Sequence, residues 1–172
     1  MRRLTGLLAL ALWACDDAPP PCAEPGALIA DPTAWRVLSD ATDPFGPAAD
    51  RCPPAAHRVE TSPERRWHEI QTTACHRATL AQPAQVAVCA GHTVRLDVWH
   101  FPITHTEEDW SLEVRVGGEA VIAYQAPVPR EAGLVTLRGV APGGRAADAE
   151  VTLRLANHGT NAWNLYDLYV EE

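Results

Sequence analysis

The sequence predicts an all-β protein in which two antiparallel sheets pack face to face. Three observations lead to this prediction. Apolar and polar residues alternate in short runs, turns containing glycine or proline separate these runs, and no segment sustains the i, i+3, i+4 apolar spacing of a helix. A chain of 172 residues is long enough for one such domain and an additional segment.

The alternation is clearest in the runs 110-WSLEVRV-116 and 149-AEVTLRLA-156. Every second residue of a strand lies on the same face, so each run has one apolar face for a core. The residues expected there with most support are Trp110, Leu112, Val114, Val151, Leu153 and Leu155.

Weaker alternation marks further strands at residues 67–73, 86–88, 93–101, 121–124, 134–140 and 163–170. Turn signals lie between the runs, such as 117-GG-118 and 142-PGG-144. About eight short strands within residues 67–172 predict an antiparallel β-sandwich of the jelly-roll type.

The N-terminal residues 1–14 have the pattern of an export signal, in which Arg2 and Arg3 precede a short apolar run. The run is too short to span a bilayer. The sequence Leu12-Trp13-Ala14-Cys15 resembles the lipobox of bacterial lipoproteins. That resemblance implies that Cys15 is lipidated and anchors the exported protein to a bacterial membrane, on the periplasmic side or at the cell surface. An ordinary cleaved signal is the alternative, and the choice of membrane stays open.

Ten of the fifteen prolines lie between residues 16 and 66. Residues 15–27 are therefore expected to form a stiff tether that begins at the lipidated cysteine. Residues 28–66 contain few apolar repeats and many turn residues, so we expect a loop-rich collar beside the sandwich domain of residues 67–172.

Four cysteines remain after Cys15, namely Cys22, Cys52, Cys75 and Cys89. An even number in an exported protein predicts disulfides, and four cysteines allow three pairings. We favour Cys22–Cys52 and Cys75–Cys89, because each pair closes a modest loop. A zinc site is the alternative, but no CxxC spacing supports it.

The formal net charge of −8 and the absence of a basic stripe argue against a nucleic-acid partner. No GxSxG elbow or glycine-rich phosphate loop is present. The segment 99-WHFPITHTEEDW-110 carries His100 and His105, and His158 could approach them to hold a zinc ion. A solvated acidic loop with incidental histidines is the simpler interpretation.

All three asparagines of the chain lie in 157-NHGTNAWN-164, between the last two predicted strands. In the structural interpretation, Asn157 and Gly159 adopt positive φ, while Asn161 and Asn164 bond neighbouring backbone. In the functional interpretation the same loop faces outward. Its amides would bind hydroxyl groups and Trp163 would stack on a sugar ring, with Trp99 and Tyr166 beside it.

The polar loop followed by 163-WNLYDLYV-170 resembles the closing strands of galactose-binding-like jelly rolls and related carbohydrate-binding modules. The resemblance implies an eight-stranded sandwich, often a structural calcium ion, and ligands that range from glycans to proteins. The expected ligand-binding residues are then Asn157, His158, Asn161, Trp163 and Asn164.

We therefore expect a cell-envelope lipoprotein that is not an enzyme and that binds a glycan or another envelope component. The alternative is an accessory or assembly lipoprotein that binds a protein partner. A metal-dependent enzyme is a more distant alternative.

Overall fold

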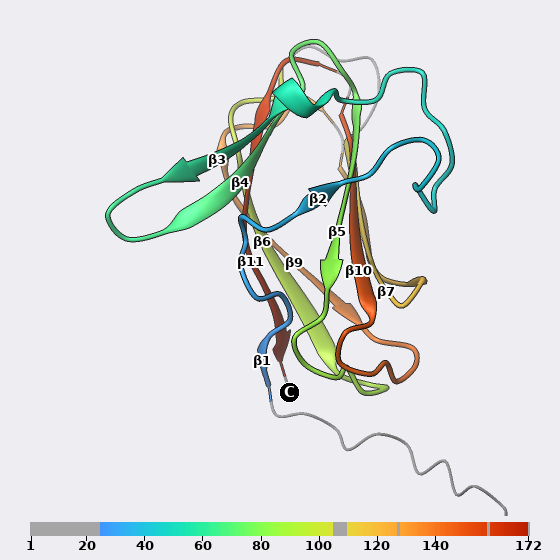
Figure 1. Cartoon of the computed structure of the whole chain (residues 1–172). Helices are drawn as coiled ribbons and strands as arrows, with labels where there is room; N and C mark the ends of the chain where they lie inside the picture. The colour runs from blue at the N-terminus through green and yellow to red at the C-terminus, as the bar shows by residue number, and fades with distance from the viewer. Residues whose placement is uncertain (1–24, 105–109, 127, 158, 172) are drawn as a thin grey trace, which may run out of the picture.

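The computed structural model of the chain is a sandwich of two antiparallel β-sheets (Figure 1), as the alternation predicts. The structure describes residues 25–104, 110–126, 128–157 and 159–171. No helix within these ranges is long and apolar enough to cross a membrane.

The described part of the chain contains eleven strands and one 3₁₀ turn, joined by loops. Their bounds are β1 Gly26–Ala27, β2 Arg36–Val37, η1 Pro54–Ala56, β3 His57–Thr61, β4 Arg66–Gln71, β5 Arg77–Pro83, β6 Thr93–His100, β7 Trp110–Val116, β8 Glu119–Ala126, β9 Gly133–Val140, β10 Glu150–Ala156 and β11 Ala162–Glu171.

One sheet has six strands and the other has five. The six-stranded sheet has the order β3-β4-β11-β6-β9, with β1 added to the far end of β11. The five-stranded sheet has the order β2-β5-β10-β7-β8. The hairpin β3–β4 projects from one side of the sandwich, and β1 lies beside the C-terminal end of the chain (Figure 1).

The core lies between the inner faces of the two sheets, and the alternating residues fill it as predicted. The six residues expected there are at most 1% exposed. Burial alternates residue by residue along β6 and β7, so each strand gives one face to the core and one to the exterior.

Strand β5 was not predicted, because its sequence RATLAQP does not alternate. Both of its faces are covered. Ala78 and Leu80 face the core, while Thr79 and Ala81, on the opposite face, are at most 2% exposed. A strand covered on both sides needs no polar face, so the periodic signal is lost. Residues 86–88 form only an isolated bridge at Val88 instead of the expected strand.

The segment expected to be a collar contributes strands to both sheets. Strand β2 pairs with β5, and β3 pairs with β4, so residues before 67 extend the edges of the sandwich. The rest of residues 38–52 forms a loop that lies against β5, as its bonds from Leu38 to Thr79 and from Cys52 to Arg77 show.

The predicted cysteine pairing is wrong, because Cys52 is bonded to Cys75. The backbone N–H of Cys52 donates to the carbonyl of Arg77, which brings the loop beside the start of β5. The Cα atoms of the two cysteines are 4.8 Å apart, within the range that a disulfide needs. Closeness in space, and not a short loop in the sequence, decides the pairing. Cys89 is also disulfide-bonded, and Cys22 lies outside the described residues.

Gly139 allows the two sheets to approach at the β8–β9 side of the sandwich. A Cβ atom at this position would lie 1.8 Å from the carbonyl oxygen of Val121 on β8. Real Cβ atoms do not come so close to backbone, so only glycine fits here without a shift of the strands.

Candidate functional site

Asn157 closes the turn between β10 and β11 from the inside. Its side chain is fully buried, and its Nδ2 donates to Thr72 Oγ1 and to the carbonyl of Gly159, each at 2.8 Å. Gly159 has a φ of 147°, whereas Asn157 is not among the positive-φ residues. Of the two residues expected to need positive φ, the glycine has it and the asparagine does not. This side chain supports the turn and is not presented to a ligand.

Asn161 clamps the segment that follows β6. Its Oδ1 accepts from the N–H of Phe101 at 3.1 Å, and its Nδ2 donates to the carbonyls of Phe101 and Pro102 at 2.9 and 3.2 Å. The residue is 5% exposed. Its amide therefore takes the place of a strand partner for the backbone of Phe101. The structural interpretation of the loop expected such a bond from Asn161 to backbone.

Trp163 is 0% exposed, so the expected surface platform at this position is wrong. Its ring lies 4.8 Å from that of Trp110 and 5.0 Å from that of His100, centroid to centroid. These rings fill the end of the core. The reason is the register of β11, in which Trp163 pairs with His100 and points between the sheets.

His100 is a core residue in the structure. It is 0% exposed, and its Nδ1 donates to the carbonyl of Phe101 at 2.8 Å. Burial and the charge of Arg130 lower the pKa of His100, against the opposing effect of this hydrogen bond. Within the described ranges, no three His, Cys, Asp or Glu side chains are placed to hold a metal ion. His105 and His158 lie outside those ranges.

Asn164 differs from the other two asparagines because it faces outward. Its neighbour Trp163 points into the core, so Asn164 lies on the outer face of the six-stranded sheet. It is nevertheless 6% exposed, and its buried Oδ1 has no hydrogen-bond partner among the described residues. A buried acceptor without a partner costs about 1–3 kcal/mol. A fully buried atom can accept from a bound hydroxyl only after the side chain turns outward, which the outer-face position of Asn164 allows and the inner position of Asn157, whose Oδ1 also has no partner among the described residues, does not.

The strand register places a row of side chains across this outer face. Asn164 pairs with Trp99 on β6 and with Glu69 on β4. Trp99 pairs in turn with Leu134 on β9, and Glu69 with Arg58 on β3. We call Leu134, Trp99, Asn164, Glu69 and Arg58 the outer row.

Exposed aromatic and apolar groups lie at the Trp99 end of the outer row. The rings of Trp99 and Phe101 meet edge to face, with centroids 4.5 Å apart. Phe101 is 50% exposed and Leu134 is 59% exposed. The backbone of Phe101 is held in place by the Asn161 clamp, so one buried asparagine side chain supports the ring pair that Trp99 and Phe101 form.

A second aromatic pair lies two residues along each strand from the outer row, at Trp67 before Glu69 on β4 and at Tyr166 after Asn164 on β11. The ring centroids of Trp67 and Tyr166 are 5.7 Å apart, and the guanidinium of Arg65 lies 5.0 Å from the Tyr166 centroid. Between the two aromatic pairs lie Asn164 and the polar groups of β4. Gln71 Nε2 donates to Glu69 Oε1 at 2.9 Å, which fixes the carboxylate beside Asn164.

The charges of this face compensate one another. Glu69 and Arg58 have opposite signs and are cross-strand partners. Asp97 accepts from Thr136 Oγ1 at 2.6 Å and lies 3.2 Å from Arg95. The outer row therefore combines a flat apolar surface with hydrogen-bonding groups and no excess of either charge.

The sequence pattern could have located part of this site. The burial of Trp163 and the period of a strand already place Asn164 on the opposite face. Likewise Trp67, Glu69 and Gln71 alternate with the buried Ile70, which predicts one polar and aromatic face on β4. The sequence does not reveal that β4, β11 and β6 are neighbours.

The chain matches no family model and no curated relative. Among the solved structures that resemble it are several whose names describe carbohydrate-binding modules or sugar-binding proteins. TmCBM61, solved with β-1,4-galactotriose, has a TM-score of 0.47 and 12% identity, over 83% of this chain and 90% of its own. A putative sugar-binding protein from Bacteroides thetaiotaomicron has a TM-score of 0.47 and 8% identity, over 84% of this chain and 92% of its own. The C-terminal CBM6 of LamC from Zobellia galactanivorans has a TM-score of 0.42 and 11% identity, over 68% of this chain and 89% of its own. At this level of similarity, we draw nothing about the ligand of the present chain from them.

Proposed function

We propose that the protein is a non-enzymatic binding module that holds a neutral glycan chain across the outer row. The observation that carries this proposal is the Oδ1 of Asn164, a buried acceptor that has no partner among the described residues and lies beside the half-buried Trp99. A sugar presents hydroxyl donors and apolar C–H faces in alternation. This site offers an acceptor and a flat ring in the same order.

Three members of the outer row, Trp99, Asn164 and Glu69, have separate roles in this proposal. Trp99 stacks on the C–H face of one sugar ring, while Phe101, whose ring is nearly perpendicular to that of Trp99, packs against the side of the same sugar. The Asn164 carbonyl accepts from a hydroxyl of that ring or the next. The Glu69 carboxylate accepts a hydrogen bond from a further hydroxyl, and Gln71 holds this carboxylate in place. Adjacent strands are about 4.8 Å apart, so Leu134 to Glu69 spans about 14 Å, which fits a short oligosaccharide.

We also propose that the module is exported and lipid-anchored through Cys15. Its ligand would then be a component of the cell envelope. The lipobox-like sequence and the proline-rich segment after it support this part of the proposal. Metabolic labelling with an alkyne-tagged palmitate tests it. The wild-type chain should incorporate the label and the Cys15→Ser variant should not, whereas equal labelling of both would exclude lipidation at Cys15.

The test of binding uses neutral polysaccharides in affinity electrophoresis, followed by calorimetry with oligosaccharides of any that retard the protein. Trp99→Ala and Asn164→Ala should each weaken binding about tenfold or more. Val140→Ala is the matched control, because Val140 lies on the same sheet face, is 61% exposed, and sits at the opposite end of β9 from Leu134. Unchanged binding in Trp99→Ala would exclude the outer row as the site.

A protein partner is the second candidate, because Phe101 and Leu134 leave an exposed apolar surface beside Trp99. Such a partner would cover these two side chains and not require the Asn164 acceptor. Cross-linking in intact cells distinguishes the two. A single envelope protein that is captured by wild type and Asn164→Ala, but lost with Leu134→Asp, would favour the protein partner over the glycan.

A further inference from the structure

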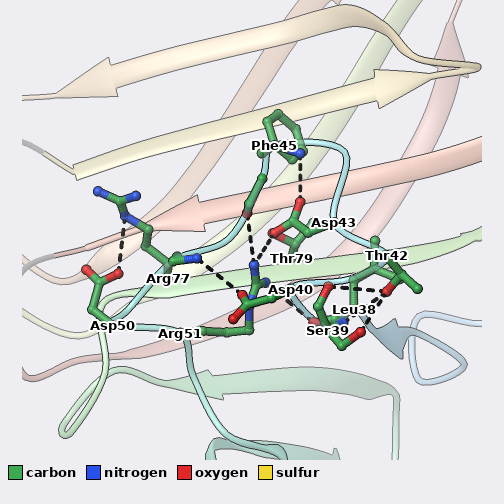
Figure 2. A network of polar contacts seen from close by, with 12 residues as sticks. Leu38, Ser39, Asp40, Thr42, Asp43, Phe45, Asp50, Arg51, Arg77 and Thr79 are labelled. Carbon is green, nitrogen blue, oxygen red and sulfur yellow. Dashed lines mark hydrogen bonds and ion pairs between the residues drawn. The ribbon is translucent and has the colours of Figure 1, made fainter.

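The outer face of the five-stranded sheet is covered over only part of its width. The loop of residues 38–52 lies across β5, where Asp43 Oδ2 accepts from Thr79 Oγ1 at 2.8 Å. Arg51 donates to Asp43 and to Asp40, each at 2.6 Å, and fixes the loop from within (Figure 2). Burial opposes ionisation of Asp43, but the hydrogen bonds from Phe45 N–H, Thr79 and Arg51 outweigh it and lower its pKa.

The cover ends at Phe45. The guanidinium of Arg115 on β7 lies 4.1 Å from the Phe45 ring centroid, and that of Arg154 on β10 lies 5.0 Å from it. Beyond this ring, toward the edge strand β8, the sheet has a groove of about 260 Å³. Its lining includes Ser111, Glu113, Ala123, Gln125 and Arg154. The groove is hollow because Ser111 and Ala123 are short.

Arg154 is the one lining side chain with a positive charge, and it has no carboxylate partner among the described residues. Its cross-strand partner is Glu113, but Glu113 accepts from Arg115 at 2.7 Å. Arg115 therefore neutralises Glu113, and the groove is left with one uncompensated guanidinium. This positive group occurs in a chain whose formal net charge is −8.

We propose that this groove is a second ligand site, which binds the carboxylate of an acidic sugar such as a uronic acid. A guanidinium presents two parallel N–H donors that match a carboxylate, and the guanidinium of Arg154 lies over the Phe45 ring, which limits its movement. Ser111 and Glu113 then bond the ring hydroxyls of the same sugar. The outer row of the other sheet binds neutral sugars, so the two faces recognise different chemistry.

The experiment is a titration of the ¹⁵N-labelled protein with glucuronate and, in parallel, with glucose, followed by NMR. Glucuronate should shift the backbone amides of residues 111–113 and 123–125 in a saturable way. Glucose should leave them unchanged. Equal shifts with both sugars, or no saturable shift with glucuronate, would overturn the proposal.

Two variants of equal charge test the role of Arg154. Arg154→Gln should weaken glucuronate binding about tenfold or more, the cost expected for losing a charge-assisted pair. Arg58→Gln removes the same charge from the other sheet and should leave glucuronate binding unchanged. Equal weakening by both variants would show that glucuronate responds only to net charge.

The test of the groove does not depend on whether the outer row binds a glycan. Trp99→Ala should not alter glucuronate binding, and Arg154→Gln should not alter binding of a neutral glycan. Failure of one site therefore leaves the other to be judged separately. Because the amide shifts map the site on wild-type protein, a misfolded Arg154→Gln variant would not remove the test.

Discussion

Replacing Asn161 tests whether the asparagine-rich turn is structural. Its amide makes three hydrogen bonds to the backbone of Phe101 and Pro102, and the residue is 5% exposed. A net contribution of about 1 kcal/mol per bond gives a loss of about 3 kcal/mol in the free energy of unfolding for Asn161→Ala. The lost clamp should also free Phe101 and so weaken binding at the outer row.

Asn164→Ala is the matched control, because Asn164 is 6% exposed and its Oδ1 has no partner among the described residues. Removing this acceptor breaks no hydrogen bond of Oδ1 and relieves its desolvation cost, so Asn164→Ala should not show the loss of about 3 kcal/mol expected of Asn161→Ala. Urea unfolding followed by the fluorescence of the buried tryptophans measures both variants. Similar losses for the two, or a loss under about 1 kcal/mol for Asn161→Ala, would refute the assignment of the clamp.

Asn161→Asp sharpens this test. The aspartate keeps the acceptor for the Phe101 N–H, but its second oxygen faces the carbonyls that Nδ2 contacts in the wild type. Repulsion should raise the folded-state pKa of this carboxyl above its unfolded value, so that the variant gains stability as the pH falls through the raised pKa. A variant whose stability relative to wild type does not change with pH would contradict this geometry.

Two further predictions concern the interior. Gly139→Ala should destabilise the fold by about 2 kcal/mol or more, because its Cβ would overlap the carbonyl of Val121. Thermal unfolding measures this loss, and Gly133→Ala is the control, because nothing lies within 4 Å of a Cβ atom at Gly133. Burial, with a smaller effect of His57, lowers the pKa of His68 to about 4. Below about pH 6.5 the unfolded chain therefore binds a proton at His68 that the folded chain does not bind. The free energy of unfolding should fall by about 3 kcal/mol as the pH falls from about 6.5 to about 4. Urea unfolding at a series of pH values should show this slope in wild type and a reduced slope in His68→Gln; equal slopes would contradict it.

The sequence pattern predicted the strands that have one face in the core and one in solvent. Strands β7 and β10 alternate because only their inner residues are covered, and their boundaries agree with the structure within one residue. Strand β5 escaped prediction because the loop of residues 38–52 covers its outer face as well. Alternation reports a difference between faces, and β5 has none.

The candidate site was predicted in its residue types more than in its position. An outward tryptophan and an outward asparagine do lie together, but they are Trp99 and Asn164 from neighbouring strands. The prediction named Asn164 and put Trp163 first among the rings, with Trp99 and Tyr166 beside it, but Trp163 points the opposite way from its neighbour Asn164. Cross-strand neighbours depend on the pairing of β11 with β6, which the sequence of either strand alone does not contain.

The pairing of β1 with the far end of β11 has a mechanical consequence. Gly26 lies opposite Val170, whereas Asn164 lies six residues earlier on β11, about 20 Å away. In a chain anchored through Cys15, as proposed, tension between the membrane and a glycan held on the outer row would run lengthwise along β11. The hydrogen bonds between β1 and β11 lie across that direction, so the pull would shear them together and not peel them one after another. The point of attachment would then withstand a brief load better than so short a strand implies.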